Sequence, residues 1–333
     1  MTARPEFDAP GSARFKRVLV SGANGFVGRA LCRALAAQGV EVTALVRTAC
    51  EIAGARHVHA VGDFTRVKDW RPWLANIDAV AHLAAVTHDG TRGASSAHFH
   101  ALNVDVSHAL ATAAVDSGIR RFVYLSSIKV NGEASPRVGG VIHAFSGADT
   151  PAPEDDYGRS KLAAEQRLRA LWAGVDGALT VLRPPLVYGP GQKGNLPRLM
   201  ALVARGVPLP FGALENRRSL IHVDSLASAI VRALGIRSAG LRCYTLADVD
   251  VSSAELVRAM AHGLGVEARL VAVPGMVLEG LCGVPVVGPR LRRLCGSLLV
   301  DARVIENELE WSALLPFEQA MADTCAAWRR APA

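Results

Sequence analysis

The chain lacks features typical of membrane, secreted and nucleic-acid-binding proteins. Its six cysteines show no close pairing and most lie in apolar surroundings, so we expect reduced thiols rather than disulfides. Its most apolar late segment, residues 276–300, is interrupted by two prolines and three arginines, which leaves no stretch of the ~20 apolar residues that a membrane helix needs. The formal net charge of +7 arises without a long run of lysine or arginine. That distribution argues against a nucleic-acid partner and suits anionic small molecules.

The chain also has no apolar targeting segment at its start. Residues 1–14 are polar and contain proline, so we expect a flexible tail and a cytoplasmic protein. The ten histidines come without a matching cluster of cysteines or carboxylates, so we expect no metal site. Half of the 333 residues are apolar and 20% are charged, which predicts a globular chain of one large or two ordinary domains.

A glycine-rich turn follows the first β-branched run of the sequence. Residues 17–21 predict a strand, a helical pattern covers residues 26–38, and Gly22, Gly25 and Gly28 lie at their junction. A strand, a glycine turn and a helix N-terminus together cradle a pyrophosphate, because glycines allow the backbone to approach closely. The spacing is Gly-x-x-Gly-x-x-Gly rather than Gly-x-Gly-x-x-Gly. The turn therefore predicts a dinucleotide site, the alternative being simple packing between strand and helix.

Strand and helix patterns alternate through the first half of the chain. We expect further strands at residues 41–47, 57–62, 79–83, 121–126 and 179–182, and helices at 65–74, 99–117 and 157–172. This alternation predicts a Rossmann-type α/β fold, a doubly wound parallel sheet of six strands over residues 15–180.

The alternation of strand and helix patterns is less regular in the second half, residues 181–330. We expect helices at 195–205, 224–234 and 252–263, a strand at 242–246 and a mostly helical end at 300–330. These patterns predict a smaller mixed α/β substrate domain. Residues 219–234 belong either to it or to the first domain.

Two residues of the predicted helix at 157–172 suggest proton transfer. Tyr157 and Lys161 are four residues apart and therefore share one helix face. A phenol has a pKa near ~10, and an ammonium group at ~4 Å favours its ionised form by about 4 kcal/mol at an effective dielectric of ~20. Tyr157 is thus a candidate proton donor, the alternative being a half-buried aromatic beside a solvated charge. Ser126 and Ser127 end a strand at the carboxyl edge of the sheet, where ligands bind in such folds.

These features together resemble the extended short-chain dehydrogenase/reductases, and within them the NAD-dependent epimerase/dehydratase family of nucleotide-sugar enzymes. The resemblance covers residues 17–311. Besides the glycine turn, the two serines and the Tyr-x-x-x-Lys pair, it rests on five motifs: Asp63 within Gly-Asp-Phe, His82-Leu-Ala-Ala, Asn103-Val, Arg183-Pro-Pro-Leu-Val-Tyr-Gly-Pro and Arg218-Ser-Leu-Ile-His-Val-Asp.

The resemblance implies roles for individual residues. Ser127, Tyr157 and Lys161 would be catalytic, with Tyr157 as the acid/base and Lys161 on the nicotinamide ribose. Contacts with the cofactor are implied for Gly22, Gly25, Phe26, Val27, Gly28, Arg47, Asp63, Phe64, Leu83, Ala84, Ala85, Asn103, Ser126, Tyr157, Lys161 and Pro184. Contacts with the substrate are implied for Ser127, Lys129, Asn195 and Arg218. A homodimer through the helices from Phe99 to Ser117 and from Tyr157 to Trp172 is also implied.

The sequence favours NADP over NAD, although NAD remains an alternative. NAD binders usually carry an acidic residue about ~20 positions after the glycine turn, which bonds the ribose 2′-hydroxyl. Here the second strand ends in Ala-Leu-Val-Arg47, with no acidic residue at its tip. Arg47 suits a 2′-phosphate; the alternative is that it stacks on adenine and either cofactor binds.

The string Ser126-Ser-Ile-Lys-Val-Asn-Gly-Glu133 has Asn131 where the family usually has tyrosine. It resembles the branch of UDP-N-acetylquinovosamine-type dehydrogenases and favours reduction of a UDP-linked 4-keto-6-deoxy-HexNAc. The alternatives are a UDP-sugar 4-epimerase with tightly bound NAD, a non-catalytic NADP-sensing regulator and a reductase of a hydrophobic ketone.

Overall fold

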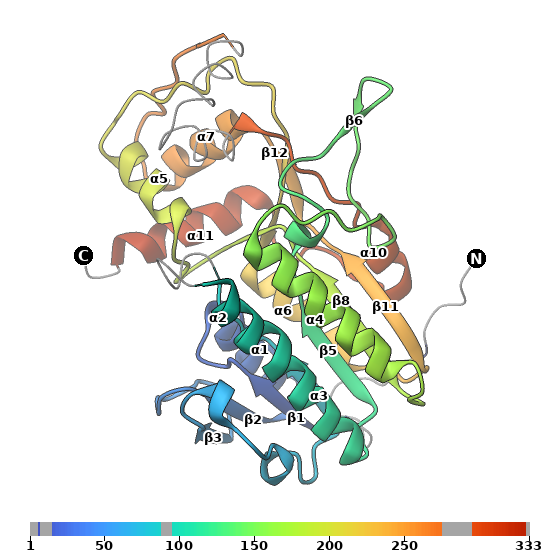
Figure 1. Ribbon diagram of the computed structural model, residues 1–333. Coiled ribbons are helices and arrows are strands. Elements are labelled where there is room, and N and C mark those ends of the chain that lie inside the picture. Colours follow the sequence, from blue (N-terminus) through green and yellow to red (C-terminus); the bar gives the residue numbers. More distant parts are fainter. Residues whose placement is uncertain (1–5, 7–14, 88–94, 275–294, 331–333) are drawn as a thin grey trace.

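The main sheet has seven parallel strands in the order β11-β8-β5-β4-β1-β2-β3 (Figure 1). The structure is a computed structural model, and it describes residue 6 and residues 15–87, 95–274 and 295–330. The strands are β1 Arg17–Ser21, β2 Glu41–Val46, β3 His57–Ala60, β4 Ala79–His82, β5 Arg121–Leu125, β8 Ala178–Arg183 and β11 Gly240–Thr245. Every neighbouring pair is parallel, which confirms the predicted doubly wound α/β fold.

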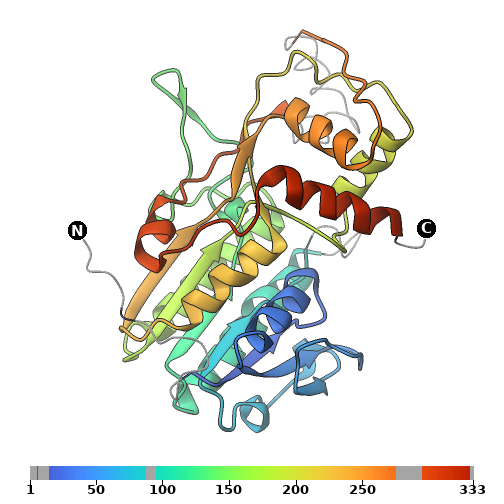
Figure 2. The same cartoon turned by 180° about the vertical axis from the view of Figure 1, so that it is seen from behind.

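Helices cover both faces of this sheet, and alternate residues of each strand enter separate cores. Val18 and Val20 of β1 pack in one core with α1 (Phe26–Ala36) and α6 (Val223–Leu234). Figure 2 shows these two helices side by side. Leu19 enters the opposite core. There it packs with α3 (Val106–Asp116) and α4 (Asp156–Trp172).

Two helical predictions for the first half need correction. Residues 65–74 form two 3-10 turns, η1 Phe64–Arg66 and η2 Arg71–Trp73, rather than one helix. Pro72 lacks the amide hydrogen that an α-helix needs, and the Asp69 side chain accepts a hydrogen bond from the Arg71 amide at the start of the second turn.

The helix expected at residues 99–117 begins earlier and is not uniform. It consists of α2 (Ser96–His100), the π-helical segment η3 (Ala101–Asp105) and α3. Ser95 begins this run, because its side chain accepts a hydrogen bond from the His98 amide.

A seventh strand corrects the six-strand prediction. β11 was expected within the second half, but it pairs with β8 as the edge strand of the main sheet. The chain after residue 181 therefore returns to the main sheet twice: α6 packs against the sheet, and β11 extends it. Helix α10 (Arg303–Leu309) joins them, since Ile305 and Leu309 lie in the same core as α1 and α6.

The rest of the second half forms a smaller layer around its own core. A three-stranded sheet has the order β12-β10-β9, with β9 Leu186–Tyr188, β10 Arg218–His222 and β12 Val249–Val251. Helices α5 (Asn195–Ala204), α7 (Ser253–Gly263) and α11 (Phe317–Arg330) pack around a third apolar cluster (Figure 1). No helix among the described residues combines the length and apolarity required to cross a membrane.

Candidate active site

The glycine turn after β1 is folded tightly against the end of β4. Gly22 has a φ of +70°, and a Cβ atom there would lie 2.7 Å from the backbone nitrogen of Ala84. A Cβ atom at Gly28 would lie 2.3 Å from the carbonyl oxygen of Gly22. A larger residue at either position would therefore push the turn away from the neighbouring backbone.

The first turn of α1 is suited to an anion. Gly25 is its N-cap and supplies no side-chain acceptor, and the first turn contains no acidic residue. The leading amide groups of the helix are therefore not occupied by a capping side chain, and the helix dipole favours negative charge at this end. These features fit the pyrophosphate of a dinucleotide cofactor at Gly22, Gly25 and Gly28.

Ser127, Tyr157 and Lys161 converge from two elements at the carboxyl end of β5. Ser127 caps the short turn η4 (Ile128–Val130), while Tyr157 and Lys161 lie on the first turns of α4. Ser127 lies close enough to the phenol of Tyr157 to lower its pKa. Lys161 Nζ donates a 2.7 Å hydrogen bond to the carbonyl oxygen of Leu125. The structure thus brings together the three predicted catalytic residues.

Burial controls the ionisation of Tyr157 and Lys161. Desolvation raises the pKa of Tyr157 above its usual value, although the nearby Ser127 side chain opposes this shift. Desolvation lowers the pKa of Lys161 to about 7, and the nearby carboxylate of Glu165 opposes it. Lys161 Nζ lies 6.0 Å from the Tyr157 ring centre. Burial is the largest influence on the Tyr157 pKa in this structure, and the expected lowering of that pKa by Lys161 stays a prediction.

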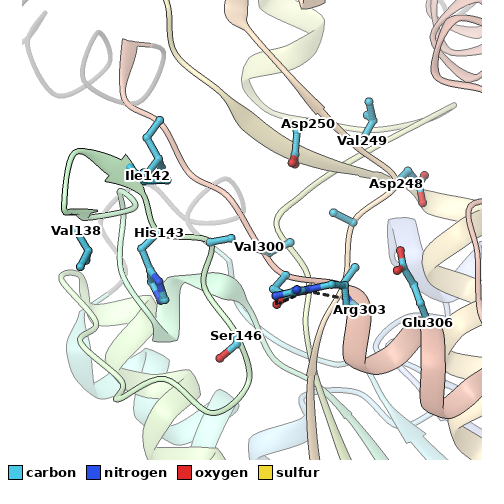
Figure 3. Close-up of a pocket in the computed structure, with 15 residues that line it drawn as sticks. Val138, Ile142, His143, Ser146, Asp248, Val249, Asp250, Val300, Arg303 and Glu306 are labelled. Atoms are coloured by element: carbon cyan, nitrogen blue, oxygen red, sulfur yellow. Dashed lines mark hydrogen bonds and ion pairs between the residues drawn. The ribbon is translucent and has the colours of Figure 1, made fainter.

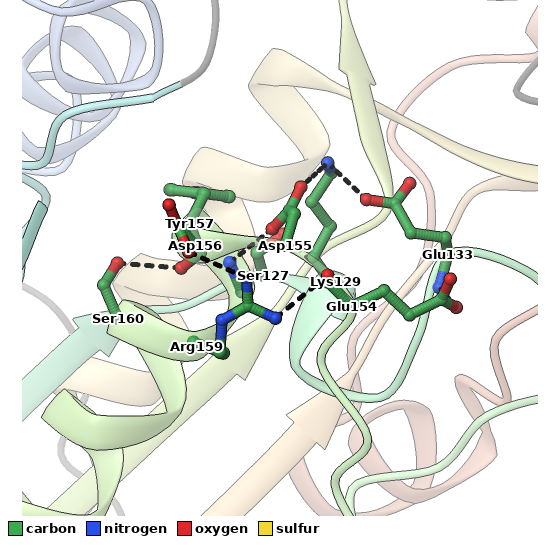
Figure 4. A network of polar contacts seen from close by, with 10 residues as sticks. Ser127, Lys129, Glu133, Glu154, Asp155, Asp156, Tyr157, Arg159 and Ser160 are labelled. Carbon is green, nitrogen blue, oxygen red and sulfur yellow. Dashed lines mark hydrogen bonds and ion pairs between the residues drawn. The ribbon is translucent and has the colours of Figure 1, made fainter. Parts of the chain in front are cut away.

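The helix α4 is capped beside this trio by a charged cluster (Figure 4). Asp155 Oδ1 accepts a 2.7 Å hydrogen bond from the Gly158 amide, and its other oxygen lies 2.6 Å from Lys129 Nζ. Glu133 also accepts from Lys129, at 2.7 Å. The Lys129 ammonium is thus neutralised by two carboxylates, and its contact with substrate stays a prediction.

Behind the trio, Ser126, Glu165 and Arg183 form a buried polar cluster. The sequence analysis did not predict the pairing of Glu165 with Arg183. The side chain of Ser126 donates to Glu165, and Glu165 pairs with Arg183. The Ser126 hydroxyl is therefore engaged within the protein. Two signals were available in the sequence. Glu165 follows Tyr157 and Lys161 at four-residue spacing, and Arg183 ends a buried strand where an arginine requires a partner.

Asn103 and His82 fix the loop that follows β4. The Asn103 amide accepts from the Val86 amide at 2.8 Å and donates to the Ser160 hydroxyl of α4 at 2.9 Å. His82 lies between the hydroxyls of Ser21 and Ser107, at 2.5 and 2.8 Å. Burial lowers the pKa of His82 to about 3, so the ring is neutral near pH 7.

The remaining predicted cofactor residues lie around the carboxyl edge of the sheet. Arg47 follows β2 and is exposed; its carbonyl oxygen accepts a hydrogen bond from the Gly62 amide, while its guanidinium forms no hydrogen bond or ion pair with the described part of the chain. Asp63 caps η1 by accepting hydrogen bonds from the Thr65 amide and hydroxyl. Pro184 is buried, and its carbonyl accepts a 3.0 Å hydrogen bond from Ile128. Among the others, Phe64 and Ala84 are buried, whereas Phe26, Val27, Leu83 and Ala85 are half-buried.

The predicted substrate residues Asn195 and Arg218 lie in the smaller layer. Asn195 is exposed at the first position of α5. Arg218 opens β10, is half-buried, and donates to the carbonyl oxygen of Gly296 at 2.9 Å. Their roles with substrate stay predictions.

Two described cavities lie away from Ser127, Tyr157 and Lys161. One of about 750 Å³ lies between the β6–β7 hairpin (Arg137–Val138 and Val141–Ile142), β12 and α10 (Figure 3). The other, of about 870 Å³, lies between β12, α7 and the start of α11. Neither is lined by Ser127, Tyr157 or Lys161. Among the described residues, no group of three or more His, Cys, Asp or Glu is placed to hold a metal ion.

Known proteins share both the sequence and the fold. Residues 18–242 match the NAD dependent epimerase/dehydratase family. A UDP-glucose 4-epimerase of Vibrio cholerae is 34% identical over 95% of this chain and 96% of its own length. A 2-alkyl-3-oxoalkanoate reductase of Stenotrophomonas maltophilia is 32% identical over 68% of each chain. The solved structure of MoeE5 in complex with UDP-glucose and NAD superposes with a TM-score of 0.74 and 27% identity, over 94% of this chain and 99% of MoeE5.

The family match begins in β1 and ends in β11, so it spans the whole main sheet and the trio on its carboxyl edge. The Vibrio cholerae relative extends the similarity to almost the full length of both chains. This chain therefore belongs to the NAD-dependent epimerase/dehydratase family of nucleotide-sugar enzymes.

Proposed function

We propose that this enzyme transfers a hydride at C4 of a UDP-linked sugar, acting as an NADPH-dependent reductase of a 4-keto-6-deoxy-HexNAc. The observation that carries the proposal is the convergence of Ser127, Tyr157 and Lys161 beside a glycine turn suited to a dinucleotide. A non-catalytic sensor would need the glycine turn but not the grouping of Ser127, Tyr157 and Lys161.

The side chains of the trio have distinct tasks in this reaction. Ser127 and Tyr157 present two hydroxyl groups that are close enough for Ser127 to lower the phenol pKa, so both can bind one substrate oxygen. Tyr157 is protonated near pH 7 because burial raises its pKa, so it can donate the proton that a C4 alkoxide requires. A bound nicotinamide supplies the hydride when the cofactor is reduced. Lys161 orients the ribose of that cofactor from the same helix face.

The residues that would hold the cofactor follow the edge of the sheet. Gly22, Gly25 and Gly28 receive the pyrophosphate at the N-terminus of α1. Asp63 lies beyond β3, where it would reach the adenine. Arg47 follows β2 with its guanidinium exposed, and we propose that it pairs with the 2′-phosphate of NADP.

A UDP-sugar is supported by two comparisons and by the charge of the smaller layer. The relative from Vibrio cholerae is named for UDP-glucose, and MoeE5 was solved with that sugar nucleotide. Arg218 offers a planar guanidinium, whose fork geometry suits a diphosphate. We propose that Arg218 and Asn195 grip the diphosphate. A reductase of hydrophobic ketones has no use for them, although one relative carries such a name.

A UDP-sugar 4-epimerase is the second candidate, favoured by the 34% identical relative of that activity. The two candidates use the trio differently. A reductase needs one proton donation from Tyr157 and releases oxidised cofactor. An epimerase retains its cofactor, so Tyr157 must take and return a proton within one cycle.

The proposal is tested by incubating the purified protein with UDP- and dTDP-sugars and their 4-keto derivatives. Cofactor absorbance reports net reduction, and product analysis reports epimerisation. We also propose a homodimer through the helix run α2–η3–α3 and α4, which size-exclusion chromatography with light scattering would test. A cytoplasmic location stays a prediction.

A further inference from the structure

We propose that the buried ion pair between Glu165 and Arg183 is a positioning device for proton transfer. It holds the turn that carries Ser127 against the helix that carries Tyr157 and Lys161. The inference rests on the proposed function only in assuming that these three residues act on one substrate.

The ion pair is buried and doubly bonded. Glu165 is 0% exposed and Arg183 is 1% exposed. Arg183 Nη2 lies 2.5 Å from Glu165 Oε2, and Arg183 Nε donates to Oε1 at 3.0 Å. This two-point contact fixes the relative orientation of the side chains as well as their separation.

Both members of the pair reach the segment that carries Ser127. Glu165 Oε1 accepts a 2.5 Å hydrogen bond from Ser126, the residue immediately before Ser127. Arg183 Nη1 donates at 3.1 Å to Asn131, the residue that ends the η4 turn. The segment is therefore held at both of its ends, on either side of the Ser127 hydroxyl.

The same pair also sets the position of α4. Tyr157, Lys161 and Glu165 follow one another at four-residue intervals and share one face of the helix. Glu165 is bonded to Arg183 at the end of β8, and Lys161 is bonded to the Leu125 carbonyl at the end of β5. Two contacts along one helix face fix both its rotation and its position along the axis relative to the sheet.

Fold stability alone does not explain an ion pair at this position. Removing two charges from water is costly, and apolar residues of similar volume often replace a buried pair with no loss of stability. What apolar residues cannot supply is the set of directional bonds to Ser126 and Asn131. Proton transfer requires donor and acceptor within hydrogen-bond reach, and a displacement of ~1 Å can cost about 10²-fold in rate.

The decisive variant is the apolar double substitution Glu165→Leu/Arg183→Met. It removes both charges together, so neither is left buried without a partner. The matched control is Arg169→Gln, which removes an arginine that is 3.6 Å from the same carboxylate but is 40% exposed. Each protein is examined for thermal midpoint, cofactor dissociation constant, kcat and KM, and the double variant also by crystallography.

We expect the double variant to keep the thermal midpoint of the wild type. Its cofactor dissociation constant should stay within about 3-fold of the wild-type value, while kcat falls by ~10- to 100-fold. Its crystal structure should show a longer distance between the Ser127 and Tyr157 hydroxyls than the wild type has. Arg169→Gln should retain the kcat of the wild type. A folded double variant with wild-type kcat and an unchanged Ser127–Tyr157 distance would overturn the inference.

Two further arms keep the test conclusive. If the double variant does not fold, Ser126→Ala decides, because it deletes one hydrogen bond to Glu165 and leaves the ion pair in place. Its kcat should fall several-fold with an unchanged thermal midpoint, and an unchanged kcat would reject the inference. If the wild type itself turns over no nucleotide sugar, the proposed function fails, and the Ser127–Tyr157 distance in variant crystals still decides the positioning role.

Discussion

Lys161 Nζ lies 6.0 Å from the ring centre of Tyr157, and it donates its hydrogen bond to the Leu125 carbonyl rather than to the phenol. The lysine is thus held by the backbone at the end of β5, in a buried setting that disfavours its charge. Ser127 is the side chain that opposes the rise of the phenol pKa. In the protein alone, the group that favours ionisation of Tyr157 is therefore a serine, while the lysine is poised to change charge near neutral pH.

This relationship predicts how stability depends on pH. Burial lowers the Lys161 pKa from 10.5 to about 7, so between these values the unfolded chain binds one proton that the folded chain does not. Stability should therefore rise with pH across that window, by at most about 1.4 kcal/mol per pH unit from this group. Denaturant titrations should show that Lys161→Met loses this rise. The exposed Lys68→Met is the control and should keep it; equal slopes for all three proteins would disprove the lowered pKa.

Tyr157→Phe tests the proton donor. We expect kcat to fall by about 10² to 10⁴, the range that a positioned acid or base contributes, while cofactor affinity changes little. Steady-state kinetics and cofactor titration measure the two effects. Tyr244→Phe is a matched control, because the Tyr244 hydroxyl is bonded to Glu308 on a different part of the sheet. Near-normal turnover in Tyr157→Phe would remove Tyr157 from the mechanism.

Gly28→Ala tests the close packing of the glycine turn. The added Cβ would lie 2.3 Å from the Gly22 carbonyl oxygen, so the turn must move away from the site of the pyrophosphate. We expect a loss of cofactor affinity of at least ~10-fold, measured by calorimetry. Gly174→Ala is the control, because a Cβ there meets no atom within 4 Å. Tight cofactor binding by Gly28→Ala would show that the turn does not approach the phosphates.

Arg47→Ala tests the choice of cofactor. The guanidinium at the end of β2 should attract the additional phosphate of NADPH, so the variant should lose affinity for NADPH and keep its affinity for NADH. A charge-assisted bond of this kind contributes ~1.5 to 3 kcal/mol, or about 10- to 100-fold in dissociation constant. Arg56→Ala is the control, because Arg56 precedes β3 and pairs with Glu41 at the other end of β2. Equal dissociation constants for the two cofactors, unchanged in Arg47→Ala, would contradict the preference for NADP.

The sequence predicted the parts of the site that depend on local spacing. Tyr157 and Lys161 lie on one face because the helix period places them there, and Ser127 ends a strand at the carboxyl edge of a parallel sheet. The glycine turn was predicted for the same reason, since its shape follows from neighbouring residues.

Features that depend on distant partners were not predicted. The strand pattern near β11 gave no information about its pairing with β8, which is a long-range contact. Likewise, the lowered pKa of Lys161 follows from burial beneath several elements, and the pairing of Glu165 with Arg183 joins a helix to a strand. No local pattern encodes these distances.

The most direct test of the central claim is turnover of a UDP-linked 4-keto-6-deoxy-HexNAc by the purified enzyme with added NADPH. The account predicts one NADPH oxidised for each 4-hydroxy sugar formed, with this activity abolished in Tyr157→Phe. Conversion of UDP-GlcNAc to UDP-GalNAc by enzyme that carries tightly bound NAD, with no net cofactor consumption and no reduction of the 4-keto sugar, would contradict it.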